Sequence, residues 1–482
     1  MASSPEGPAR TPAGTVQPDP GHDDGGGLTG AVVVVALVSA ISGLLYGYDT
    51  GIISGALLQI SDEFGIGSGW EQVIAASILA GAVVGALVCS RLSERRGRRT
   101  TLLIVAAVFV VGALAASLAR DPLTLSLARV VLGFAVGGAT QTAPVYVAEL
   151  APSRYRGRLV LFFQIAIGVG IVIATIVGAT ESVDWRLAIG AAAVPGALML
   201  LFLLRLPDSP RWLVKAGQRD RAQQALEGVR PRGDDVSGEM RDIDELVEAE
   251  REASTSGWRG LREAWVRPAL VVGCGLAIFT QLSGIEMIVY YSPTILTDNG
   301  FSDSAALRVS VALGVTYLVT QLIGLAIIDR VGRRRLTLLT LPGAALSLIV
   351  LGSFFVTGND GDAQVPYIIA TLIAFMAFTA GGIQLMGWLT GSEIYPLATR
   401  EAGAAAQSAS LWGTNLLITL TLLSTIETIG TGQTFWLYAG FNIAAFVFLY
   451  RKMPELTGRS LEQIEGKLSK GQFRPADFAR GR

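Results

Sequence analysis

Three ionisable side chains lie well inside long apolar stretches of this sequence: Asp49, Arg129 and Glu286. Asp49 is the only charged residue in the run from Ala31 to Ile60. A charge at the centre of a membrane helix costs about 2.5–3.5 kcal/mol on insertion scales, so such a residue needs a partner or a water-filled path. A functional role is therefore the first hypothesis for Asp49.

Asp49 and Arg129 are predicted to meet. Helix rise places Asp49 about 28 Å from the cytoplasmic end of its helix, and Arg129 about 12 Å inside the outer end of its own. Both charges then fall in the outer half of the bilayer. Two interpretations follow: a pair that titrates during function, or a fixed ion pair that only stabilises the fold.

The composition indicates which elements hold these charges. Hydrophobic residues make up 51% of the 482 residues and charged residues only 16%, with a mean hydropathy of +0.50. This is too apolar for a soluble chain of this size. The net charge of −1 and the short Arg-rich loops give no sign of a nucleic-acid partner. No nucleophile, metal cluster or cofactor loop is visible, so we expect no enzyme, cofactor or metal.

Apolar runs of about twenty residues, the length that spans a bilayer, recur about twelve times. Each run must be helical, because lipid offers no hydrogen-bond partner to backbone groups. The sequence thus predicts an all-α membrane protein with spans at 31–60, 71–90, 100–119, 123–149, 159–180, 186–205, 267–296, 306–328, 336–357, 364–392, 402–425 and 434–450.

Short Arg-rich loops predict the topology, because such loops stay in the cytoplasm. They follow the second span as RLSERRGRR and the fourth as SRYRGR. Both termini are then cytoplasmic. The expected organisation is a disordered tail at 1–27, a six-helix bundle at 28–206, an intracellular helical linker at 207–266, a second six-helix bundle at 267–453 and a tail at 454–482; a floppy linker is the alternative for 207–266.

An internal repeat relates the two bundles. The motif ERRGRR at 94–99 recurs as DRVGRR at 329–334, and the spacing of Glu149, Pro152 and Arg156 recurs at 393, 396 and 400. Duplicated halves are typical of secondary transporters, whose site lies between the halves near the midplane. The repeat therefore predicts a pseudo-symmetric carrier.

Several motifs together make the chain resemble the sugar porter family of the major facilitator superfamily. They are GYDTGIISGAL, the two Arg-rich loops, YVAELAPSRYRGR, LPDSPRWL, GSEIYP and PELTGRSLEQIE. The resemblance implies the major facilitator fold, with twelve helices in two pseudo-symmetric six-helix bundles. It also implies that Asp49 and Arg129 match the proton-coupling pair of proton-linked members, although Ala192 stands where some of these members carry another carboxylate.

The resemblance further implies a sugar site, since amides can pair with hydroxyls and aromatic faces can stack on an apolar ring face. The matching residues are Gln164, Gln281, Tyr290, Tyr291, Trp388 and Trp412, with Asn415 one helical turn beyond. Four positions depart from the family pattern: Thr280, Leu411 and Glu286 stand for amides, and Gln384-Leu385 for Gly-Pro. We therefore add Glu286 to the site, where it could bind substrate, carry a second proton or serve the structure.

Charged residues at the cytoplasmic helix ends are implied to form a gate that locks the halves when the site faces outward. An isolated surface pair contributes only about 0–1 kcal/mol, so a gate requires a network. Topology alone is the competing explanation for the Arg residues. The expected members are Arg96, Arg99, Glu149 and Arg156, and in the second half Arg333, Arg334, Glu393 and Arg400.

The function that we expect is proton-coupled symport of a monosaccharide, polyol or related small solute by alternating access. The alternatives are a facilitative uniporter, or a proton-antiporting exporter of a modified sugar or drug-like solute. A sugar receptor is less consistent, because receptors usually add a long signalling tail. The expected partners are the solute, protons and the lipid bilayer, with the chain acting as a monomer in the plasma membrane.

Overall fold

The computed structural model describes residues 29–180, 182–231, 235–252, 257–357, 364–459 and 461–478. The regular elements of these residues are all helices, and twelve helical segments among them are long and apolar enough to cross a membrane. The all-α fold predicted from the apolar runs is therefore confirmed. The tail expected to be disordered, residues 1–27, lies outside the described residues.

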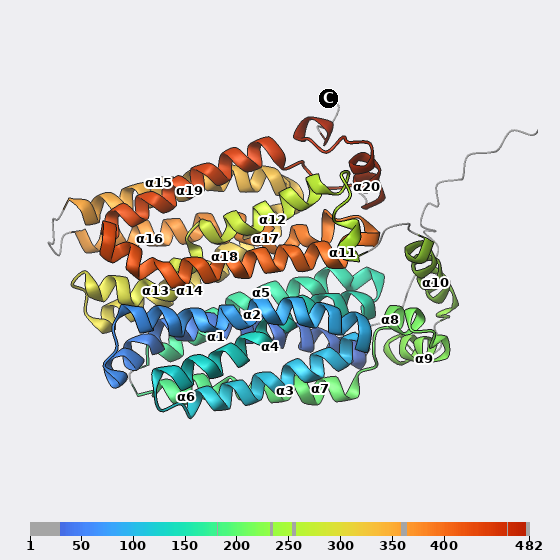
Figure 1. The fold of residues 1–482 in the computed structure, drawn as a ribbon, viewed down its shortest axis with the longest axis horizontal. Helices are drawn as coiled ribbons and strands as arrows, with labels where there is room; N and C mark the ends of the chain where they lie inside the picture. Colours follow the sequence, from blue (N-terminus) through green and yellow to red (C-terminus); the bar gives the residue numbers. More distant parts are fainter. Residues whose placement is uncertain are drawn as a thin grey trace, which may run out of the picture.

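The helices form two layers, one from the first half of the chain and one from the second half (Figure 1). The first layer contains α1 (Gly30–Phe64), α2 (Ser68–Arg96), α3 (Arg98–Ser117), α4 (Pro122–Leu150), α5 (Ser153–Gly178), α6 (Trp185–Ala191) and α7 (Ala193–Arg205). The second layer contains α12 (Arg267–Leu282), α13 (Ile285–Asp298), α14 (Asp303–Val331), α15 (Arg333–Val356), α16 (Val365–Ala380), α17 (Ile383–Glu393), α18 (Arg400–Ile429) and α19 (Thr431–Lys452).

Three of the expected spans are each built from two helices: α6 with α7, α12 with α13, and α16 with α17. The break between α12 and α13 centres on Gly284, whose φ of 93° is readily adopted only by glycine. Interrupted membrane helices are tolerated where they are buried in protein or line a cavity. Two of these breaks therefore mark places in the second half where a site can form.

Glycines set the tight packing within the first half. A Cβ atom at Gly47 on α1 would lie 1.9 Å from the carbonyl oxygen of Ile167 on α5, and one at Gly133 on α4 would lie 1.8 Å from that of Ile78 on α2. Small residues let membrane helices approach this closely, where lipid supplies no hydrophobic drive for association. This backbone contact between α1 and α5 sets the rotation of α1 about its own axis. It thereby sets the direction in which the face that carries Asp49 is turned.

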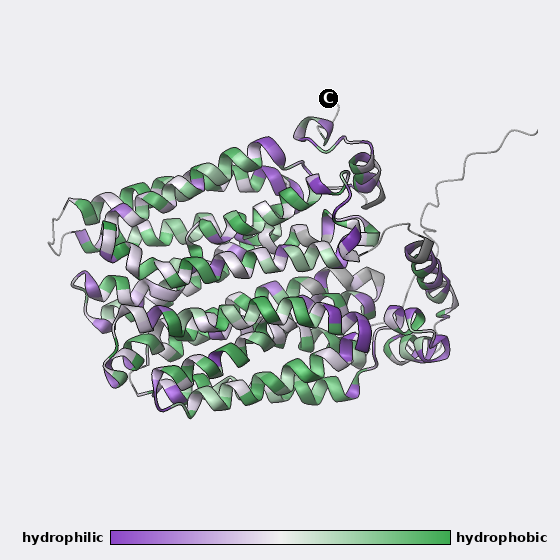
Figure 2. Cartoon of the chain, in the orientation of Figure 1, coloured by the Kyte–Doolittle hydropathy of each residue, from purple (hydrophilic) through white to green (hydrophobic). Residues whose placement is uncertain are grey.

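The helices between the halves gather at one end of the bundle. They are α8 (Pro210–Lys215), α9 (Arg219–Val229), α10 (Ser237–Glu252) and α11 (Gly257–Gly260). The C-terminal helix α20 (Leu461–Ser469) lies at the same end (Figure 1). Figure 2 shows hydrophobic residues along the bundle and hydrophilic residues concentrated at this end. The amphipathic helices expected in 207–266 are thus present among the described residues.

Candidate functional site

The predicted pair of Asp49 and Arg129 is formed in the structure. Arg129 Nη2 lies 3.5 Å from Asp49 Oδ2, and the two side chains are 0% and 5% exposed respectively. Arg129 Nε donates a hydrogen bond to the carbonyl oxygen of Ile74 at 2.9 Å. Neither Nη1 nor Nη2 of Arg129 has a hydrogen-bond partner within the protein, so the pair is an ion pair of loose geometry. Proton coupling by this pair stays a prediction.

Glu286 follows directly on the helix break at Gly284, in the first turn of α13. Gln384 Nε2 donates to Glu286 Oε1 at 3.3 Å, while Oε2 has no hydrogen-bond partner within the protein. Among the ion pairs of the described residues none involves Glu286, although its side chain is buried. The positive end of α13 is a favourable neighbour for a carboxylate, yet one oxygen is left for a ligand or a proton.

Aromatic rings from both halves meet beside Glu286. The ring of Tyr46 on α1 lies 5.2 Å from that of Trp412 on α18 and 5.9 Å from that of Trp388 on α17. The rings of Trp388 and Trp412 are 6.0 Å apart, and Phe163 on α5 approaches Trp388 at 6.4 Å. The two tryptophans expected at the site thus come together, and Tyr46 packs against both.

Several buried polar atoms on the helices that carry these rings, and on α12 and α14, have no partner within the protein. They belong to both amide atoms of Gln164, Gln281 and Gln321, to Gln384 Oε1, to Trp412 Nε1 and to Asn415 Nδ2. An unpaired buried polar group costs free energy, and native proteins contain few of them. Such a concentration of donors and acceptors in the interior can pair with a ligand that bears several hydroxyl groups.

The tyrosine pair of α13 divides between two tasks. Tyr291 donates from its hydroxyl to the carbonyl oxygen of Thr419 on α18 at 2.9 Å, so it joins helices within the second half. Tyr290 lies close enough to Asp49 and Glu286 to feel both charges. Asn415 also serves partly within its own helix, since its Oδ1 accepts from Thr419 at 3.2 Å. Of the two tyrosines, Tyr290 is the one that interacts electrostatically with both carboxylates.

Residues that the sequence did not single out complete the site. Tyr46 and Tyr317 lie beside Glu286, and a Cβ atom at Gly168 would lie 2.7 Å from Gln321 Oε1. Gly168 is one helical turn from Gln164, so Gln321 on α14 faces the α5 surface of the other half. The sequence showed only that an amide or a phenol side chain lies within a predicted span. The packing of the helices determines which of these side chains face the centre of the molecule.

The expected gate at the inner helix ends centres on a different arginine. Arg98 donates from Nε and Nη2 to Glu149, at 2.9 and 3.2 Å, and from Nη2 to Glu401 at 2.7 Å. Glu149 belongs to the same half as Arg98, whereas Glu401 on α18 belongs to the other. Arg98 therefore connects the two halves of the molecule, and neither Arg98 nor Glu401 was predicted.

The pairing expected for Arg96 and Arg99 is corrected by the structure. Arg96 is exposed at the end of α2, and Arg99 donates to the carbonyl oxygens of Leu203 and Leu204 at 2.9 and 3.0 Å. The reason is helical phase, because only the first residue after Gly97 points toward α4. The side chain of Arg156 lies outside the described residues.

The second half repeats this arrangement with one difference. Arg333 donates to Glu393 at 3.1 Å, but its additional partner is Asp329 of its own half at 2.5 Å. Arg334 donates to the carbonyl oxygen of Tyr450, and Arg400 to that of Tyr395. Among the described contacts, Arg98 bridges the two halves of the molecule, whereas its repeat counterpart Arg333 does not.

Two carboxylates hold the repeated turns that position these arginines. Asp208 Oδ1 accepts from the backbone N–H groups of Arg98 and Arg99 at 2.9 and 3.2 Å, and Glu455 Oε1 accepts from that of Arg333 at 3.0 Å. The turn glycines Gly97 and Gly332 have φ values of 94° and 101°. Burial raises the pKa of Asp208, and the N–H donors partly offset this rise.

Comparison with known proteins agrees with this architecture. The sequence profile described as "Sugar (and other) transporter" matches residues 35–468. The chain belongs to this sugar transporter family, as its motifs indicated, and it is a transporter of the major facilitator superfamily and not an enzyme.

Similar proteins carry sugars and polyols. The D-xylose transporter of Levilactobacillus brevis is 38% identical over 440 residues, which cover 90% of this chain and 95% of the relative. The major myo-inositol transporter IolT of Bacillus subtilis is 34% identical, over 89% of this chain and 93% of the relative. The xylose transporter XylE from E. coli, in a partially occluded inward-open conformation, superposes with a TM-score of 0.76 at 25% identity, over 90% of this chain and 100% of XylE.

Proposed function

We propose that this chain is a proton-coupled symporter that imports a monosaccharide, polyol or related small solute by alternating access. The observation that carries the proposal is the set of unpartnered buried amides from both halves, together with the contact of the Tyr46, Trp388 and Trp412 rings across the halves and the buried Asp49–Arg129 pair. The relatives support it, since they include transporters of D-xylose and myo-inositol, and XylE is described as a proton:xylose symporter.

When the solute binds, its hydroxyl groups form hydrogen bonds with polar atoms of the protein that were unpaired before. Gln164 comes from the first half and Gln281, Gln321 and Gln384 come from the second, so one polyhydroxylated molecule can pair with groups of both halves. Each good hydrogen bond contributes about 0.5–1.5 kcal/mol, and more where the protein atom was unsatisfied. The indole faces exclude water and contact the apolar faces of the solute. Binding thereby draws the halves together.

Proton coupling is assigned to Asp49. Its carboxylate is buried and meets Arg129 only loosely, and its protonation leaves the buried Arg129 without a counter-charge, so the protonation state of Asp49 changes the energy of this region. Tyr290 lies near enough to Asp49 and Glu286 to interact electrostatically with both. Through this electrostatic link, occupancy of the proton site can favour occupancy of the solute site.

Alternating access requires contacts between the halves that can open one end at a time. At the end carrying α8–α11 the halves are joined by Arg98 and Glu401. At the opposite end, Gln72 Nε2 donates to Ser424 Oγ at 2.9 Å, and Ser68 donates to Glu427 at 2.5 Å. Since the solute site lies between these two sets, opening either end exposes the site to one side of the membrane.

The test is uptake by purified protein in sealed proteoliposomes. D-xylose, D-glucose and myo-inositol are supplied as labelled solutes, with and without an inward proton gradient. Accumulation above the external concentration, abolished by a protonophore, supports symport. Equilibration without accumulation would identify a facilitative uniporter, and solute-driven proton efflux would identify the antiporter.

We also propose a plasma-membrane location with both termini in the cytoplasm, on the basis of the Arg-rich ends of α2, α3, α14 and α15. Protease protection of tags at both ends in right-side-out vesicles tests this orientation. Digestion of either tag from outside would contradict it.

A further inference from the structure

A cavity lies away from the proposed solute site, at the end of the bundle that carries the inter-half helices. Its volume is about 490 Å³. It is formed where the start of α12, the end of α19 and the segment after α20 come together. The residues that line it are Arg267, Pro268, Val271, Val272, Arg451, Lys452, Gly471, Phe473 and Arg474.

The charge of this cavity is entirely positive. Four of the lining residues are cations and none is a carboxylate, in a chain whose net charge is −1. All four cationic side chains are exposed, and among the ion pairs of the described residues none involves them. The cavity also contains the N-terminal turn of α12, a 16-residue helix whose dipole has its positive end there and favours an anion. An anionic group is therefore the ligand that the cavity can hold.

One wall of the cavity is apolar and continues onto the membrane-facing surface. Val271, one turn into α12, is 50% exposed, whereas Phe473 on the opposite wall is only 5% exposed. An exposed valine beside a cluster of cations matches a molecule with an anionic head and a hydrocarbon body. A small soluble anion would leave the apolar wall uncovered.

The wall contributed by the C-terminal segment is held in place. Phe473 and Phe478 pack edge to face at 5.6 Å, and the cationic groups of Arg459 and Lys467 lie over the ring of Phe478 at 5.3 and 4.7 Å. The backbone N–H of Arg474 donates to Asp477 Oδ2 at 2.8 Å. Arg474 is thus fixed opposite Arg267, 207 residues away in sequence, and the cavity is formed before any ligand binds.

We propose that this cavity binds the phosphate headgroup of an anionic phospholipid from the leaflet facing α8–α11, with an acyl chain along Val271. Basic pockets beside membrane helices on the cytoplasmic side are suited to anionic headgroups. The site joins α12, α19 and the C-terminal segment, all in the second half, so lipid binding there anchors the tail to that half.

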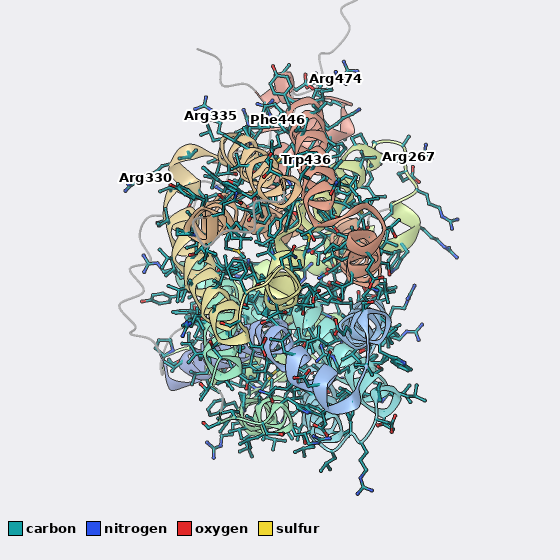
Figure 3. All side chains as sticks on the ribbon, turned by 90° about the vertical axis from the view of Figure 1, so that its left-hand side faces the viewer. Arg267, Arg330, Arg335, Trp436, Phe446 and Arg474 are labelled. Carbon is teal, nitrogen blue, oxygen red and sulfur yellow. The ribbon has the colours of Figure 1, made fainter. Side chains whose placement is uncertain are left out.

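The test compares two variants that each remove two cations from the same end of the second half. R267Q/R474Q changes the cavity, and R330Q/R335Q changes two exposed arginines that Figure 3 places on the opposite flank. Binding of phosphatidylglycerol to the purified full chain is measured by native mass spectrometry, with phosphatidylcholine and inorganic phosphate as the other probes. Gel filtration and circular dichroism check that both variants are folded.

We expect phosphatidylglycerol to bind the unchanged chain in preference to phosphatidylcholine, and R267Q/R474Q to weaken it on the order of tenfold while R330Q/R335Q changes it little. Equal losses in both variants, or none in either, would overturn the proposal. Displacement of the lipid by millimolar phosphate would make the ligand a soluble anion and overturn the lipid assignment. Should R267Q/R474Q fail to fold, R451Q/K452Q gives the same comparison.

Discussion

Arg98 Nη2 lies 2.7 Å from Glu401 Oε1 and so joins the first half of the molecule to the second. The same guanidinium binds Glu149 of its own half, and its side chain is only 2% exposed. One arginine thus carries both a contact that stabilises a half and a contact that opposes separation of the halves. Substitution of Glu149 and substitution of Glu401 are therefore expected to have different effects.

Glu401→Gln is expected to open the end of the bundle near α8 without unfolding the protein. Since Glu401 is 33% exposed, its pairing with Arg98 contributes about 1 kcal/mol after solvent screening, which changes the conformational equilibrium about fivefold. The measurement is the labelling rate of a cysteine placed at Ser408, beside Gln141 of the other half. An unchanged rate would show that this ion pair is not a gate.

Glu149→Gln supplies the matched comparison, because it removes the partner of Arg98 that lies in the same half as Arg98. Its carboxylate is 7% exposed and receives two hydrogen bonds from Arg98. Breaking so buried a pair is expected to cost about 3 kcal/mol and to lower the melting temperature. A melting temperature equal to that of Glu401→Gln would contradict this division of tasks.

Asp49→Asn is expected to abolish accumulation driven by a proton gradient while leaving solute exchange measurable. The amide keeps the shape of the protonated acid but cannot release a proton. Asp62→Asn, an exposed change at the end of the same helix, is the control. Gradient-driven accumulation that persists in Asp49→Asn would remove Asp49 from the coupling mechanism.

Gln281→Ala is expected to weaken solute binding about three- to tenfold, with little loss of stability. Both amide atoms of Gln281 lack partners within the protein. Gln407 is the contrasting case, since it accepts from Tyr395 and donates to the carbonyl oxygen of Gly387. Gln407→Ala should therefore lower the melting temperature and leave affinity unchanged, and the reverse pattern in tryptophan-fluorescence titrations would place the site elsewhere.

Glu286→Asn is expected to change solute preference. The carboxylate has one free oxygen beside Tyr46 and Gln384, so an amide there exchanges an acceptor for a donor. We expect weaker binding of the native solute and relatively better competition by ordinary hexoses and pentoses. Unchanged competition with a flattened pH profile would make Glu286 a proton site, and loss of folded protein at matched expression would make it structural.

The sequence by itself determined much of the fold, because a bilayer leaves an apolar run of about twenty residues no alternative to a helix. The depth of Asp49 and Arg129 followed from helix rise alone, and their pairing was predicted correctly. The duplicated motifs predicted two related halves, because charged residues at the same spacing mark corresponding helix ends in each half. Gln281, Trp388 and Trp412 were proposed from the resemblance of their motifs to those of the sugar porter family, and their role in binding stays a prediction.

Only the tertiary structure decided which of several neighbouring candidates makes each contact. Arg96, Arg98 and Arg99 are equivalent in the sequence, but helical phase and the turn at Gly97 direct Arg98 alone to Glu149 and Glu401. Tyr46 and Gln321 join the site because α1 and α14 turn those faces inward. The cations Arg267 and Arg474 form one cavity through packing of the C-terminal segment. Contacts between distant segments depend on how helices rotate and cross, which side-chain volume at every interface sets together, and no local pattern records that choice.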